Sequence, residues 1–172
     1  MDPGDEIVDL IDGNDRVIGT AFRREVRAKN LFHRGAGILV RNSRGEIYVH
    51  RRTETKDVFP GRYDMLVGGM VASGESYEIA ARRELGEELG IREAELSPLF
   101  VHLYDGPHNH VRVTVFETTW DGPIRHQESE IAWGRWMSLD EILERIPEWD
   151  WVPDGLEIFE RWRATGEPRS GR

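Results

Sequence analysis

The sequence predicts an α/β fold that opens with a β-hairpin. Two segments near the N-terminus, 6–12 and 16–22, have the apolar and polar pattern of half-buried strands and are separated by the turn 12–15. Short apolar runs typical of strands recur between residues 36 and 137. Helical signals mark two longer segments, 76–89 and 154–163. Strands and helices in one chain of this length indicate an α/β protein.

The elements follow in order. After the hairpin, residues 23–31 form a short helical or irregular connector, and 36–40 and 46–52 are strands joined by the turn 42–45. A loop punctuated at 59–61 and the segment 63–67 lead to a glycine pair, Gly68-Gly69, for which we expect a tight loop. The following helix begins near Ser76, a good capping residue, and ends before Gly90.

The C-terminal half continues with strands. Residues 99–104 and 110–120 form one antiparallel pair, and 135–137 is a short strand. Ser138 and Glu141 have the spacing of a capping box and open a short helix to about residue 146. In the final helix, Leu156, Phe159 and Trp162 have core spacing.

Length and composition predict one enzyme domain over residues 1–164, with the hairpin and connector in 1–30 and a mobile polar tail in 165–172. The formal net charge of −9 opposes binding to nucleic acid or to an anionic membrane. The absence of cysteine excludes disulfides and thiolate catalysis. No apolar run approaches the roughly 18 residues of a membrane span, so we expect a cytoplasmic protein.

The helix over 76–89 carries the chemistry. Glu84, Glu87 and Glu88 lie at positions i, i+3 and i+4 and project from one side of the helix. Three carboxylates this close repel one another unless a cation lies among them, and oxygen ligands suit Mg²⁺ or Mn²⁺ better than zinc. The alternative is an ordinary solvent-exposed acidic helix. The glycines that flank the segment favour the metal site.

This segment resembles the Nudix box. Gly69, five residues, Glu75, seven residues and then Arg83-Glu84-Leu85-x-Glu87-Glu88-x-Gly90-Ile91 agree with the box at every defined position, within 23 of the 172 residues. The resemblance implies an α/β/α sandwich with a central mixed sheet and a metal-dependent hydrolase that acts on a diphosphate linkage. It also implies that Glu84, Glu87, Glu88 and the Gly69 carbonyl hold the metal, while Glu75 and Arg83 brace the loop against the helix.

A narrower resemblance is to the isopentenyl-diphosphate-isomerase-like branch of that family. The frame is Leu31-Phe32-His33-Arg34, then Arg51-Arg52, then Phe59-Pro60-Gly61 and the box. The isomerase needs a cysteine that would fall at Gly68, a metal-binding histidine that would fall at Met70, and two glutamates that would fall near His108 and His110. These departures, together with the intact box, favour hydrolysis over isomerisation.

Several further residues are candidates for the site. Either Arg51 or Arg52 is expected to bind the substrate phosphates, since neighbours on a strand point to opposite faces; the alternative is ordinary surface residues. The general base is Glu84 or, in a later loop, Glu128 or Glu130, for which the alternative is a solvated turn. Finally, His33, His108 and His110 form a second metal site or contact substrate, against the alternative of one ordered and two exposed histidines.

The sequence therefore predicts a Mg²⁺- or Mn²⁺-dependent hydrolase of nucleoside di- or triphosphates or related nucleotide derivatives. The alternatives are an isomerase, which the missing cysteine disfavours, and a catalytically silent nucleotide-binding sensor. The expected partner is a small-molecule diphosphate, with no nucleic acid and no membrane. A homodimer is an alternative to a monomer, because two-fold dimers are the commonest oligomers.

Overall fold

The computed structural model describes residues 2–165 and begins with the expected hairpin. After a single 3₁₀ turn, η1 (Pro3–Asp5), strand β1 (Ile7–Ile11) pairs antiparallel with β2 (Val17–Phe22). Helix α1 (Arg23–Lys29) follows and ends at Asn30, which adopts the left-handed conformation. The hairpin is confirmed, and the connector is a helix. Apart from Thr165, the predicted tail lies outside the described residues.

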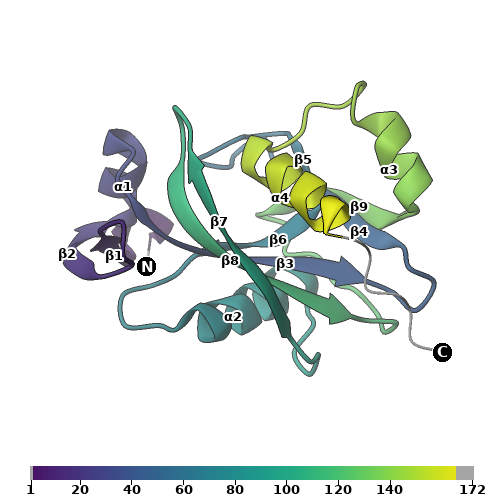
Figure 1. Cartoon of the computed structure of the whole chain (residues 1–172), viewed down its shortest axis with the longest axis horizontal. Coiled ribbons are helices and arrows are strands. Elements are labelled where there is room, and N and C mark those ends of the chain that lie inside the picture. Colours follow the sequence, from purple (N-terminus) through teal and green to yellow (C-terminus); the bar gives the residue numbers. More distant parts are fainter. Residues whose placement is uncertain (1, 166–172) are drawn as a thin grey trace.

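One mixed sheet forms the centre of the molecule (Figure 1). Its central strand, β3 (His33–Arg41), pairs antiparallel with β6 (Leu66–Met70) and parallel with β8 (His110–Thr119). The other strands are β4 (Ile47–Arg52), β5 (Tyr63–Asp64), β7 (Ser97–Asp105) and β9 (Ile131–Met137). The pair β7–β8 is antiparallel, and β4 pairs with both β5 and β9. The predicted mixed sheet is confirmed.

Helices lie on both sides of this sheet (Figure 1). Helix α2 (Tyr77–Leu89) buries Ala81, Leu85 and Leu89 in a core with Ile38 and Phe116. On the other side, α3 (Leu139–Arg145) and α4 (Pro153–Ala164) pack in a second core. The members that α3 and α4 give to that second core are Ile142, Ile158, Phe159 and Trp162. The two cores on opposite faces make the α/β/α sandwich.

Three boundaries differ from the sequence prediction. Gly68 and Gly69 lie in strand β6 and not in a loop, because their backbones pair with Gly37 and Ala36. The tight turn comes later, at Gly74, whose φ is 81°. In addition, β3 and β9 are longer than predicted because their neighbouring strands continue the hydrogen-bond ladder past the apolar runs.

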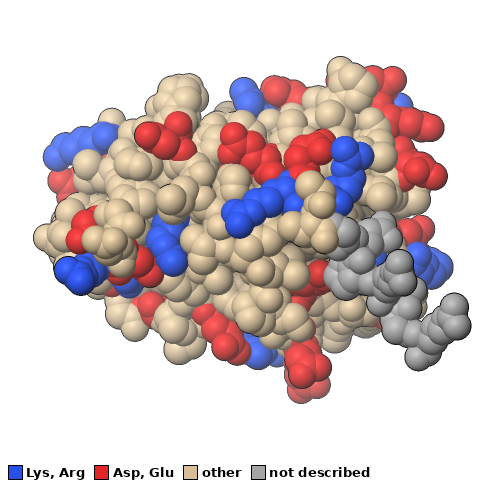
Figure 2. Space-filling view, in the orientation of Figure 1, with Lys and Arg blue, Asp and Glu red and all other residues tan. Residues whose placement is uncertain are grey.

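Charges of both signs are interspersed over the face that carries α4, β7 and β8 (Figure 2). This face has no broad field of one sign that would attract a polyanion over its whole surface. Among the described residues, no helix has the length and apolar character needed to cross a membrane.

Candidate active site

Helix α2 places two of the three box glutamates inside the protein. Ser76 caps its first turn by accepting a hydrogen bond from the Ile79 amide, and Gly90 ends it in the left-handed conformation. Glu84 and Glu88 are buried, only 9% and 6% exposed, whereas Glu87 is exposed. Positions four apart share a helix face, so the packing that buries Leu85 and Leu89 also brings this acidic pair towards the interior.

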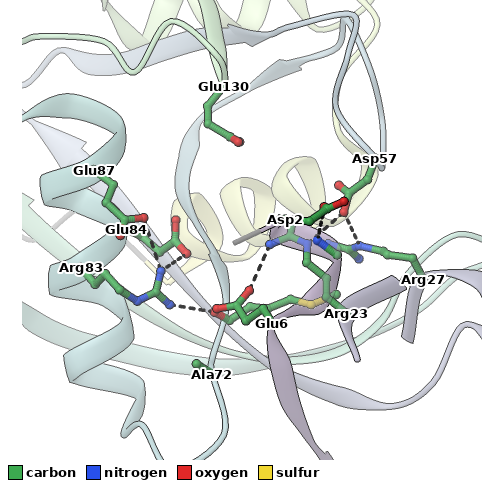
Figure 3. Close-up of polar contacts among 12 residues, drawn as sticks. Asp2, Glu6, Arg23, Arg27, Asp57, Ala72, Arg83, Glu84, Glu87 and Glu130 are labelled. Atoms are coloured by element: carbon green, nitrogen blue, oxygen red, sulfur yellow. Dashed lines mark hydrogen bonds and ion pairs between the residues drawn. The ribbon is translucent and has the colours of Figure 1, made fainter. Parts of the chain in front are cut away.

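Arg83 is the cation that holds these carboxylates. Its Nε and Nη2 donate to the two oxygens of Glu75, at 2.8 and 3.0 Å. Its Nη1 donates to Glu84 at 2.7 Å and to Glu87 at 3.5 Å, and Nη2 also donates to the Met70 carbonyl at 3.1 Å. One guanidinium therefore joins strand β6, the turn after it and helix α2 (Figure 3).

Glu84 lies directly against the backbone of Gly69. A side chain at position 69 would come within 2.6 Å of Glu84 Oε1, so glycine leaves room for Glu84 to approach this closely. Burial raises the pKa of Glu84, and burial together with the charge of Glu84 raises the pKa of Glu88. Two ionised carboxylates in this position require a cation nearby.

The donor set fits a hard divalent cation. Carboxylates of Glu84 and Glu88 and the Gly69 carbonyl offer oxygen ligands only, which Mg²⁺ and Mn²⁺ prefer. Arg83 already neutralises Glu84 and Glu87 from between them, which shows that this position attracts positive charge. Among residues 2–165, no three His, Asp or Glu side chains lie close enough together to hold a metal as they stand.

A cavity of about 100 Å³ lies beside the box, on the strand that carries Gly68 and Gly69. A side chain at Gly68 would come within 1.9 Å of the Ala36 carbonyl oxygen, so the strands approach too closely here for any other residue. The polar and charged residues that line this cavity are Arg23, Arg27, His33, Arg52, Lys56, Asp64, Asn109 and Asp154.

Of the two predicted phosphate-binding arginines, Arg52 lines the cavity and Arg51 does not. Arg52 donates from Nε and Nη2 to the Val58 carbonyl, at 3.2 and 3.0 Å. Arg51 donates instead to the Gly61 carbonyl and to Glu54. The alternation of side chains along β4 accounts for the difference.

The two loop glutamates, Glu128 and Glu130, lie in different environments. Glu128 is exposed, whereas Glu130 forms an ion pair with Lys56, a residue that lines the cavity. The loop itself is fixed, because the Thr53 amide donates to the Glu130 carbonyl and the Gln127 amide donates to the Glu88 carbonyl. Glu130 thus lies between the cavity and the end of the box helix, and Figure 3 shows it extending towards the residues of the site.

The three histidines are not gathered into one group. His33 is buried, lines the cavity and has Nδ1 at 2.8 Å from the Leu31 carbonyl oxygen. His110 stacks on Phe32 with ring centroids 4.3 Å apart, and His108 is exposed in the β7–β8 loop. Burial lowers the pKa of His33 to about 4, so this ring is neutral at pH 7.

Several cavity residues have no signal in the sequence that connects them with the site. Arg23 and Arg27 lie four apart in α1, which is visible in the sequence, but only the fold brings this helix to the cavity. Asp64 and Asp154 come from β5 and from the first turn of α4. Burial and the neighbouring Asp154 raise the pKa of Asp64 to about 7, so a proton is available at this wall near neutral pH.

Comparison with known proteins identifies the family. Residues 31–161 match the family described as NUDIX domain. The chain belongs to the Nudix family. An uncharacterised Nudix hydrolase of Streptomyces coelicolor is 43% identical over 99% of this chain and 97% of its own length. The uncharacterised Nudix hydrolase YfcD of Escherichia coli is 36% identical over 91% of this chain and 86% of its own length.

A solved structure agrees with the family assignment. DR0079 of Deinococcus radiodurans is 30% identical, with a TM-score of 0.78 over 91% of this chain and 98% of that one. The similarity of both sequence and structure over nearly the whole chain makes this protein a Nudix hydrolase. The 99% of this chain covered by the Streptomyces coelicolor relative includes the hairpin and α1, which precede the matched Nudix domain.

Proposed function

We propose that this Nudix hydrolase is a Mg²⁺- or Mn²⁺-dependent enzyme that cleaves the diphosphate linkage of a nucleoside di- or triphosphate or a related nucleotide derivative. The observation that carries the proposal is the buried pair Glu84 and Glu88, with Glu84 against Gly69, beside a cavity that Arg52 and Lys56 line. Carboxylates and cationic side chains side by side suit a metal-bound polyphosphate.

The chain's own residues supply binding and orientation. Arg52 Nη1 has no hydrogen-bond partner among the residues that the structure describes, and a guanidinium binds phosphate oxygens in a directed way. Lys56 adds a second positive charge, which offsets the charge that builds up on the leaving phosphate. Gly68 and Gly69 let the substrate approach the backbone of β6, because no side chain lies over it.

Water attack forms a new P–O bond while the P–O bond of the anhydride breaks. The proton from the water passes to a carboxylate, for which we propose Glu84, through Oε2, since Oε1 accepts the hydrogen bond from Arg83. Glu130 is the next candidate, because it lies nearer the cavity than the exposed Glu128. The divalent cation, when bound, lowers the negative charge of the diphosphate and polarises the phosphorus that is attacked.

We propose that this protein hydrolyses its substrate and does not isomerise it, although its sequence resembles the isomerase-like branch. Isomerisation of that kind would need a reactive side chain at Gly68, and the Ala36 carbonyl excludes even a Cβ at that position. Substitution by cysteine would therefore displace strand β3 or β6. Hydrolysis needs no side chain there, so the backbone supports hydrolysis.

The test is release of phosphate and pyrophosphate from a panel of compounds with Mg²⁺ or Mn²⁺. The panel comprises nucleoside di- and triphosphates, nucleotide sugars, dinucleotides, thiamine diphosphate and isopentenyl diphosphate. Metal-dependent release that Glu88→Gln and Glu87→Gln abolish supports the proposal. Glu78→Gln, an exposed change on the same helix, serves as the matched control and should retain activity.

Two other results would overturn the proposal. Conversion of isopentenyl diphosphate without phosphate release would identify an isomerase. Tight binding of one compound with no turnover of any would identify a sensor.

A further inference from the structure

The N-terminal helix α1 forms part of the cavity wall. Arg23 and Arg27 from this helix line the cavity together with Arg52, although α1 precedes the Nudix domain proper, 31–161. Their spacing of four residues places both guanidinium groups on one side of α1. The side chains are each only 17% exposed, so this side of the helix faces the interior and not solvent.

Asp57 holds both arginines in place. Its Oδ2 accepts from Arg23 Nε at 3.0 Å and from Arg27 Nε at 3.4 Å (Figure 3). Arg27 Nη1 also donates to Asn109 Oδ1 at 3.1 Å, which fixes the second guanidinium from the β7–β8 side. Although burial alone would raise it, the two arginines hold the pKa of Asp57 well below its usual range, so this carboxylate is ionised.

Positive charge exceeds the nearby negative charge in this wall. Two guanidinium groups share the Asp57 carboxylate, and Glu6 lies 3.5 Å from Arg23. Asp64 and Asp154 line the same cavity, where burial raises the pKa of both and so favours their neutral forms. Arg52 has no carboxylate within ion-pair distance among residues 2–165. Each guanidinium has five N–H donors, and within the described part of the chain fewer than half of those on Arg23 and Arg27 have a partner.

We propose that Arg23, Arg27 and Arg52 form an anion clamp that binds the terminal phosphate group of the substrate, and that Asp57 occupies part of the clamp until phosphate replaces it. This inference rests on the proposed function, since it assigns the far end of the same diphosphate site. In Figure 3 the box carboxylates Glu84 and Glu87 on α2 lie on one side of the residues drawn, and Arg23 and Arg27 on α1 lie on the other.

The clamp predicts a substrate class. A phosphate monoester or terminal phosphate has three oxygens to share among several guanidinium groups, whereas a phosphate esterified on both sides has only two. Compounds with an uncapped terminal phosphate, such as nucleoside di- and triphosphates, should be preferred to diphosphates that carry a sugar or nucleoside at each end. The hairpin and α1 are therefore part of the specificity apparatus.

The experiment measures binding of inorganic pyrophosphate to the full chain by titration calorimetry, in the absence of turnover, for four variants. Arg23→Gln and Arg27→Gln should each weaken binding by about tenfold, the effect of losing one charge-assisted contact. Asp57→Asn should tighten binding, because it removes the competing carboxylate. The matched control is Arg24→Gln, on the same helix but exposed and paired with Asp5, and it should change nothing.

The arginine variants should weaken pyrophosphate binding and Asp57→Asn should tighten it, so the two effects together distinguish a role in binding from a role in folding. If Asp57→Asn weakens binding as the arginine variants do, the cluster merely anchors α1 and the clamp is overturned. If Arg27→Gln binds like the wild type, it is overturned as well. Should an arginine variant fail to fold, Arg27→Lys, which keeps the charge, and Asp57→Asn still decide the question.

The experiments distinguish failure of the anion clamp from failure of the proposed hydrolase activity. Loss of pyrophosphate binding in Arg27→Gln, with no hydrolysis of any compound by the wild type, would leave the clamp standing and refute the hydrolase activity. Hydrolysis with unaltered binding and rates in both arginine variants would refute the clamp alone. In a supporting result, kcat/KM in Arg27→Gln falls for uncapped substrates and stays near wild type for capped ones.

Discussion

Arg83 binds Glu75 in a bidentate arrangement, with Nε and Nη2 at 2.8 and 3.0 Å from the two carboxylate oxygens. The side-chain hydrogen bonds from Arg83 lower the pKa of Glu75, so the pair is fully ionised at neutral pH. The same arginine reaches Glu84 through Nη1. The geometry of the turn after β6 and the orientation of a buried box carboxylate therefore depend on one guanidinium.

Arg83→Lys should separate these two effects. Lysine keeps the charge but cannot make two parallel bonds to Glu75, so Glu84 loses its fixed orientation. We expect kcat/KM to fall by at least tenfold and the free energy of unfolding to fall by only about 1 kcal/mol. Steady-state kinetics and urea unfolding check this. The control Arg82→Lys changes an exposed neighbour paired with Glu78, and an equal loss there would refute the special role of Arg83.

Glu88→Gln should remove stabilisation by metal. In the wild type, Mg²⁺ bound to the folded state alone would raise the free energy of unfolding by about 2.7 kcal/mol at 100 times Kd. Without the Glu88 carboxylate this gain should be lost, whereas Glu78→Gln should keep it. The measurement is the thermal midpoint with EDTA or with excess Mg²⁺. A variant whose midpoint rises as much as that of the wild type would exclude Glu88 as a ligand.

Gly86→Ala should stabilise the protein. The glycine lies inside α2, and an added Cβ would meet Arg92 no closer than 3.6 Å, an ordinary contact. Close packing therefore does not explain this glycine. Alanine should raise the free energy of unfolding by about 0.5–1 kcal/mol through its helix propensity. Urea unfolding measures the change. A free energy of unfolding below that of the wild type would show that the added Cβ does not fit at position 86.

Gly68→Ala should have the opposite effect. Its Cβ would come within 1.9 Å of the Ala36 carbonyl, and its φ of 154° is one that side chains rarely adopt. We expect a loss of more than about 3 kcal/mol in the free energy of unfolding, because two paired backbones must separate. If urea unfolding gives the Gly68→Ala variant the same free energy of unfolding as the wild type, strands β3 and β6 can move apart at no cost.

His50 should make stability depend on pH. This histidine is buried, and among the described residues its Nδ1 has no hydrogen-bond partner. Burial, together with repulsion from Arg52, lowers its pKa from 6.5 to about 3. Between these values the unfolded chain binds more protons than the folded one, so the contribution is fully present above pH 6.5 and is lost as the pH falls.

The difference in unfolding free energy between the wild type and His50→Gln should therefore rise with pH from 4 to 6.5, by up to about 1.4 kcal/mol per pH unit. Urea unfolding at a series of pH values measures it. His33 is unchanged in both proteins, so its own titration cancels from the comparison. A difference that is flat across this range would mean that His50 is solvated or paired when protonated.

The local features of this protein could be predicted from its sequence. Ser76 and Gly90 bound α2 because capping depends on side chains within one turn of the helix end. The capping box at Ser138 and Glu141 forms for the same reason. The loop predicted at Gly68 and Gly69 is wrong, because nothing local in the sequence shows that β3 pairs with them.

The candidate site was only partly predictable. The spacing of Glu84, Glu87 and Glu88 puts them on one side of a helix, but only packing decides that Glu87 stays exposed. Alternation along a strand requires Arg51 and Arg52 to face opposite ways, and the sheet decides that Arg52 reaches the cavity.

The hairpin, the two capped helices α2 and α3 and the acidic face of α2 are predictable because each follows from residues a few positions apart. The composition of the cavity is not predictable in this way, because it depends on tertiary contacts. Lys56 meets Glu130 across 74 positions and Arg27 meets Asn109 across 82. Contacts between such distant segments depend on how the sheet and its helices pack together, and no local pattern encodes them.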